Sequence, residues 1–285
     1  MINKIIKNCV LAGIAGTILV GFMLLSSPVQ AQDLDALLFK MAKEGNPVKL
    51  GNVASRHKDI DVKNKNGHTA LMFAVNEEHY LAVEKLLEYN ADVNVRDKFG
   101  QTAIMYACKA NNKKMLRRLL EEDAKLDLKN KNGRTALIVA ARNKNDEQVE
   151  ILAKAGADVS VNDNFGWSAL HYASYFGQVT MARNLLNAGA DPDVQDGEDK
   201  TSLMYAAAES NLTLVRLLIE SGANPNIQDQ NGYTPLMYAA FNKALDEVKY
   251  LVEKGADHTL TTDKGTNAAM IAQDKGFEDI FEYIS

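Results

Sequence analysis

Few residues in this chain have the types and spacing that catalysis or metal binding requires. The segment Gly166-Trp167-Ser168-Ala169-Leu170 begins like the turn that presents a nucleophilic serine, but leucine replaces its final glycine. No two of the five histidines have the i, i+4 spacing of a helical zinc site; they are His57, His68, His79, His171 and His258. We therefore expect a protein that is not an enzyme and has no metal, cofactor or small-molecule substrate.

The overall composition is that of a folded protein with an acidic surface. Hydrophobic residues make up 46% and charged residues 24% of the chain, and the formal net charge is −5. Lys4 and Lys7 lie in an N-terminal segment that we expect to be removed, which leaves 30 basic against 37 acidic residues. An acidic balance argues against a nucleic-acid partner.

One short phrase recurs through the chain and sets where its elements lie. Its best copy is Asn231–Ala239, and successive copies are 33 residues apart. The hydroxyl residue of each copy falls at Thr69, Thr102, Thr135, Ser168, Thr201 and Thr234, and Asn267 occupies the next step. No insertion interrupts this register, so no long loop is available for a catalytic lid or a metal cage.

The period, the tetrad Thr234-Pro235-Leu236-Met237 and the Gly-Ala-Asp turns at residues 156–158, 189–191 and 255–257 resemble the ankyrin repeat family. This resemblance covers residues 31–285. It implies an all-α repeat solenoid whose units each contain two helices and a β-hairpin loop. It also implies that His171, the tetrad histidine, hydrogen-bonds the neighbouring loop, and that partner proteins bind a concave face formed by the loop tips and the exposed side of the first helices.

Each repeat carries its own start and stop signals. The hydroxyl residue is suited to N-cap a first helix of about nine residues, which then begins with alanine or proline. The second helix carries an apolar stripe spaced by three and four residues, as in Val215, Leu218 and Ile219, which we expect to be buried. A left-handed residue such as Gly222 then ends that helix.

We divide residues 32–285 into eight units. The first is an N-terminal cap repeat over residues 32–63 that lacks its hairpin. Six full repeats, the second to seventh units, cover residues 64–261 and begin at positions 64, 97, 130, 163, 196 and 229. The eighth unit, residues 262–285, is a truncated C-terminal cap.

Residues 1–31 have the pattern of a secretory signal peptide. Lys4 and Lys7 precede an apolar run over residues 9–25, and small residues lead to Ala31. We expect cleavage between Ala31 and Gln32 and a periplasmic protein with a single cysteine, Cys108, at a small buried position of the repeat. The alternative is an uncleaved inner-membrane anchor, because 17 apolar residues reach the lower edge of a membrane-spanning length.

The register identifies the side chains on the concave face. In the fifth unit, four aromatic residues occupy positions that are mostly polar in the units before it, and aromatic and arginine residues are enriched at binding hot spots. The predicted partner-binding residues are Phe99, Lys131, Arg134, Arg142, Phe165, Trp167, Tyr175, Phe176, Tyr233 and Phe241. In the alternative interpretation, Phe165 and Phe176 pack against neighbouring loops and Trp167 covers a helix end.

The predicted function is recognition of another protein. The basic residues of the second to fourth units favour a partner with an acidic patch. By resemblance to exported bacterial ankyrin proteins, the partner is an enzyme that this protein inhibits or protects. If the leader is retained, the protein is instead a membrane-tethered periplasmic scaffold.

Overall fold

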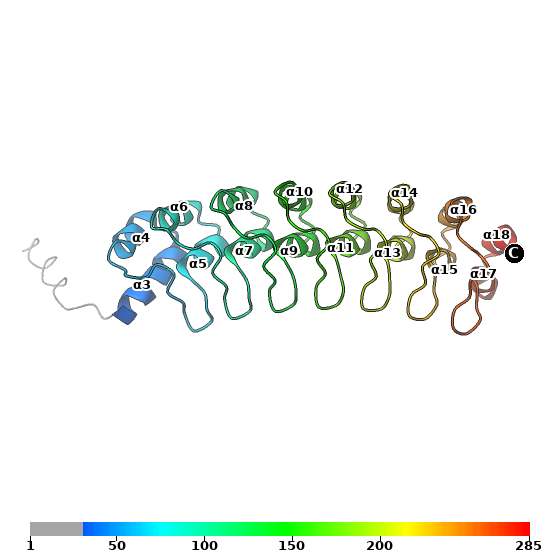
Figure 1. Cartoon of the computed structure of the whole chain (residues 1–285), viewed down its shortest axis with the longest axis horizontal. Coiled ribbons are helices and arrows are strands. Elements are labelled where there is room, and N and C mark those ends of the chain that lie inside the picture. Colours follow the sequence, from blue (N-terminus) through cyan, green and yellow to red (C-terminus); the bar gives the residue numbers. More distant parts are fainter. Residues whose placement is uncertain (1–30) are drawn as a thin grey trace, which may run out of the picture.

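The computed structural model describes residues 31–285, which form two rows of helices with a loop projecting on one side from each unit after the first (Figure 1). The described chain contains the helices α3 (Ala31–Glu44), α4 (Pro47–Ala54), α5 (Ala70–Asn76), α6 (Tyr80–Glu88), α7 (Ala103–Lys109), α8 (Lys113–Leu120), α9 (Ala136–Arg142), α10 (Asp146–Lys154), α11 (Ala169–Tyr175), α12 (Val179–Asn187), α13 (Ser202–Ala208), α14 (Leu212–Glu220), α15 (Pro235–Phe241), α16 (Leu245–Glu253), α17 (Ala268–Lys275) and α18 (Glu278–Ile284). The predicted all-α solenoid is confirmed.

Nearly all of the predicted signal peptide, residues 1–30, lies outside the described residues, and Ala31 is the first residue of α3. None of the helices between residues 31 and 285 is both long and apolar enough to cross a membrane. The loops form no strand within the described chain, where the one isolated bridge joins Asn162 to Ser168. Backbone hydrogen bonds nevertheless join neighbouring loops at regular intervals, as from the N–H of Lys131 to the carbonyl of Phe99 at 2.9 Å.

The hydroxyl residues cap the first helices as predicted. The side-chain oxygens of Thr69, Thr135, Ser168 and Thr234 each accept a hydrogen bond from the backbone N–H three residues later, at 3.3–3.4 Å. Each of these bonds satisfies one N–H group that the helix itself leaves free. Thr102 and Thr201 hold the same position without this bond.

The first helices of the full repeats have seven residues, so the expected length of about nine was wrong. Each of these helices ends because the residue nine positions after the cap is left-handed, with φ between 52° and 65°. These residues are Glu78, Asn111, Lys144, Gly177, Ser210 and Lys243. Glycine and asparagine are the residue types that usually adopt this conformation, so only Gly177 and Asn111 offered a local signal for the end of the helix.

The core is a continuous stack between the two rows of helices. The tetrad residues of the full repeats are buried, and the apolar stripe of each second helix faces inward; Leu152 on α10, for example, is fully buried. The N-terminal unit is closed by the longer helix α3, whose Asp35 Oδ1 lies 2.8 Å from Nε2 of His57.

Candidate functional site

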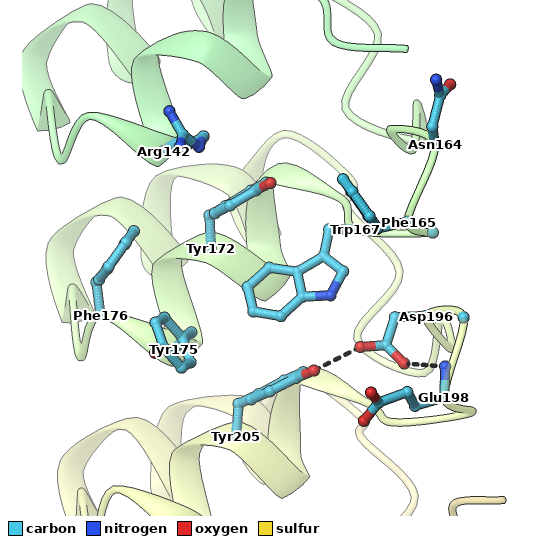
Figure 2. A pocket seen from close by; sticks show the side chains of 12 residues that line it. Arg142, Asn164, Phe165, Trp167, Tyr172, Tyr175, Phe176, Asp196, Glu198 and Tyr205 are labelled. Atoms are coloured by element: carbon cyan, nitrogen blue, oxygen red, sulfur yellow. Dashed lines mark hydrogen bonds between the residues drawn. The ribbon is translucent and has the colours of Figure 1, made fainter. Parts of the chain in front are cut away.

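Buried aspartates brace most of the loops that carry the predicted binding residues. Asp196, the first residue of its loop, accepts hydrogen bonds at Oδ1 from the backbone N–H groups of Glu198 (2.8 Å) and Lys200 (3.0 Å). Its Oδ2 accepts the hydroxyl of Tyr205 at 2.5 Å (Figure 2). Equivalent tyrosine–aspartate bonds join residues 106 and 97, 172 and 163, and 238 and 229.

These tyrosines were not predicted, although the sequence contains a signal for them. A loop begins with aspartate only where a tyrosine follows nine residues later. The other loops begin with an uncharged residue and have an apolar residue in place of the tyrosine; these pairs are Asn64 with Phe73, Asn130 with Val139 and Thr262 with Ile271. The carboxylate therefore occurs only where a hydroxyl can bind its second oxygen. Burial, together with the bond to Asp163, raises the pKa of Tyr172 to about 12.

The fifth and sixth units, with Arg142 of the fourth, form a hollow of about 820 Å³ with an aromatic floor (Figure 2). Its residues are Arg142, Asn164, Phe165, Gly166, Trp167, Tyr172, Tyr175, Phe176, Asp196, Gly197, Glu198 and Tyr205, and we call it the aromatic pocket. The Trp167 ring lies in the middle of this floor, with its centroid 4.9 Å from that of Tyr172, 4.8 Å from Tyr205 and 5.4 Å from Tyr175.

Five of the ten predicted binding residues line the aromatic pocket. Phe165 is 65% exposed and Tyr175 is 45% exposed. Trp167 and Phe176 are half-buried and pack against the core. Arg142 is exposed at the rim. The packing of Trp167 and Phe176 agrees with part of the alternative interpretation, whereas most of the Phe165 side chain is open to solvent.

The other aromatic residues of the predicted site lie apart from this pocket. Phe99, which is 59% exposed, lines a hollow of about 280 Å³ together with Tyr106 and Lys109. Tyr233 packs against Tyr238. Phe241 is 49% exposed, and the Nζ of Lys275 lies 4.0 Å from the centroid of its ring.

The two predicted basic residues in the loop of the fourth unit, Lys131 and Arg134, differ in their surroundings. Nε of Arg134 lies 3.0 Å from Oδ2 of Asp163, and the arginine side chain is only 14% exposed. Its charge is therefore balanced within the protein. Lys131 is exposed and forms no ion pair within the described part of the chain.

Ser168 and His171 are buried structural groups. The backbone N–H of Ser168 donates to Nδ1 of His171 at 3.1 Å, and Nε2 of the histidine donates to the carbonyl of Lys200, also at 3.1 Å. The implied contact between the tetrad histidine and the next loop is thus confirmed. Burial lowers the pKa of His171.

Neither Cys108 nor any group of metal-binding side chains in the described chain offers a reactive site. Cys108 is fully buried, as predicted from its repeat position, and burial raises the pKa of its thiol. Between residues 31 and 285, no three histidine, cysteine, aspartate or glutamate residues are grouped so that they could hold a metal ion.

Comparison with known proteins places these features in a family. A family model of ankyrin repeats matches residues 38–130, 76–163, 123–196 and 203–285. A search of curated proteins found no match. The crystal structure of the ankyrin repeat domain of Bcl-3, a member of the IkappaB protein family, is similar, with a TM-score of 0.68 and 29% identity over 75% of this chain and 97% of that one. The chain belongs to the ankyrin repeat family, whose repeats generally mediate protein–protein interactions.

Proposed function

We propose that this protein binds a partner protein through the aromatic pocket on the face formed by its loop tips and first helices. The observation that carries this proposal is the exposure of Phe165 in the same pocket as Trp167. An exposed phenylalanine that does not pack against the core contributes little to folding. Next to a tryptophan and an arginine, it has the composition of a binding hot spot.

We also propose that the protein acts after export and that its partner is an enzyme that it inhibits or protects. The leader-like sequence of residues 1–31 supports export to the periplasm. The second candidate is a membrane-tethered scaffold, which the length of the apolar run in the same segment favours. The mass of the protein isolated from its cells tests both, because cleavage after Ala31 removes those residues and an anchor retains them.

A pull-down from the periplasmic fraction tests the binding site. The baits are the parent chain, the double variant Arg142→Ala, Phe165→Ala, and the control Leu81→Ala. Leu81 is 64% exposed but lies on α6, in the row of second helices. We expect a protein that is captured by the parent and the control and lost with the double variant. Identical proteins on all three baits would refute the proposed pocket.

A further inference from the structure

The loop tips and the ends of the first helices carry only positive charges in the third and fourth units. These positions hold Lys98, Lys109, Lys131, Arg142 and Lys144, all exposed. None of the five takes part in the ion pairs formed among residues 31–285. Four of these charges are therefore free to meet an acidic ligand, whereas the Nζ of Lys144 lies 4.4 Å from the centroid of the Phe176 ring.

The surface charge changes from positive to negative on the other side of the aromatic pocket. In the sixth unit, the loop tip holds Glu198 and Asp199 and the end of the first helix is followed by Glu209, and all three are exposed. Lys200 neutralises only one of them, since its Nζ lies 2.8 Å from Oε2 of Glu198. Along the solenoid the order is thus basic, aromatic and acidic, with Arg142 and Glu198 on opposite sides of the same pocket (Figure 2).

The hollow beside Phe99 and the aromatic pocket lie one after the other along the solenoid axis. The hollow beside Phe99 includes Val139 of α9, and the aromatic pocket includes Arg142 at the end of the same helix. Packed helices lie about 10 Å apart, so each unit advances by roughly that distance. An extended peptide rises about 3.3 Å per residue, and about three of its residues therefore span one unit.

We propose that the partner contributes an extended segment with acidic residues on one side of an apolar anchor and a basic residue on the other. The anchor enters the aromatic pocket. The acidic residues lie about three to six positions from the anchor, over the fourth and third units, and the basic residue lies about three positions away on the other side, near Glu198 and Glu209. This inference rests on the proposed function, because it assigns the ligand of the same pocket.

Selection from a display library of random peptides of about 16 residues tests the charge order, since such peptides extend to about 50 Å and exceed the roughly 33 Å of the proposed ten-residue segment. The full chain is compared with two variants of equal charge change. The first is Lys131→Glu, Arg142→Glu, on the face; the second is Arg117→Glu, Arg183→Glu, at exposed positions on the second helices α8 and α12. Phe165→Ala serves as the third variant and removes an exposed part of the pocket.

We expect peptides with an acidic group, an aromatic or aliphatic anchor and a basic residue in that order, read in either chain direction. A selected peptide should bind the Lys131→Glu, Arg142→Glu variant about tenfold more weakly at low salt, as expected for two partly screened charge contacts. The difference should shrink in about 0.5 M salt because the Debye length falls well below 10 Å. The variant with reversed charges on α8 and α12 should bind like the parent.

The alternative outcomes separate the two proposals. Peptides that need Phe165 but show no charge order would overturn the inference and leave the pocket intact as the binding site. Peptides that bind the Phe165→Ala variant as tightly as the parent, or a selection with no enrichment at all, would overturn the proposed site together with its ligand.

Discussion

Asp196 shows how this protein buries a carboxylate without leaving either oxygen unsatisfied. One oxygen binds two backbone N–H groups of its loop, and the other binds the Tyr205 hydroxyl. A buried polar atom that loses its partner costs more than the lost hydrogen bond contributed. This asymmetry explains why the aspartate and the tyrosine occur together, or not at all, at equivalent positions of the chain.

The pairing predicts non-additive effects on stability. Tyr205→Phe should lower the free energy of unfolding by about 1–3 kcal/mol, because Oδ2 of Asp196 is left unpaired. Adding Asp196→Asn should recover part of that loss, since Asn64 and Phe73 form this combination in the second unit. Denaturant unfolding of both single variants and the double variant measures the coupling. Losses that simply add would contradict this role of the pair.

Glu247 on α16 is a buried carboxyl group that lacks such a partner. It is 2% exposed, and neither of its oxygens forms a hydrogen bond. Burial, with a smaller contribution from Asp246, raises its pKa to about 7. At the equivalent position of the fourth unit, Gln148 donates from Nε2 to the carbonyl of Ala107 at 3.1 Å. An uncharged amide thus fits this position better than a carboxylate.

Glu247 makes the stability of the protein depend on pH. The folded state holds the proton more tightly than the unfolded state, so stability falls as pH rises from about 4.5 to about 7 and stays low above that. Glu247→Gln should therefore raise the free energy of unfolding by up to about 3 kcal/mol at pH 8 and have little effect near pH 4. Denaturant unfolding at both pH values measures this. An equal effect at both would contradict it, and Glu220→Gln, at an exposed position on α14, is the control.

At the scale of the helix, the sequence predicted the starts better than the ends. A hydroxyl group before an apolar run accepts a hydrogen bond from a free N–H group of the first helical turn, so Thr69 and its equivalents mark the helix starts. The left-handed residues that end the first helices are lysine, asparagine, glutamate or serine in five of the six full repeats. Apart from asparagine, these residue types seldom adopt that conformation and give no local signal for it, and the predicted helices were two residues too long.

The predicted buried stripe of the second helices leads to a stability test at this scale. Leu152→Ala on α10 should cost about 2–5 kcal/mol, because it leaves a cavity in a fully packed position. The control Leu81→Ala, at an exposed position on α6, should change the free energy of unfolding by no more than about 0.5 kcal/mol. Denaturant unfolding compares the two, and similar values for both would mean that α10 buries a different face.

At the scale of the whole molecule, function depends on how neighbouring units combine. The 33-residue period was enough to predict the solenoid and to place Arg142, Phe165 and Tyr175 on one face. It could not predict that Trp167 rests on Tyr205 of the next unit, because that contact depends on ring positions across a unit boundary. For the same reason, the balance of Arg134 by Asp163 became visible only in three dimensions.

Within the aromatic pocket, we expect Trp167 to have both a structural and a binding role. Trp167 packs against four neighbouring rings, those of His171, Tyr172, Tyr175 and Tyr205. Trp167→Ala should therefore lower both the melting temperature and the affinity for the partner. Thermal unfolding measured beside binding separates the two effects, and a melting temperature equal to that of the parent would show that the indole does not support the pocket.

The most direct test of the pocket is the affinity of the captured partner for the Phe165→Ala variant, measured by titration calorimetry beside the parent. Phe165 is exposed, so its removal should leave the melting temperature within about 1–2 °C of the parent. We predict that binding weakens by about 2 kcal/mol, or roughly 30-fold, as for a hot-spot residue. An unchanged affinity in a variant that melts like the parent would show that the partner binds elsewhere on the solenoid.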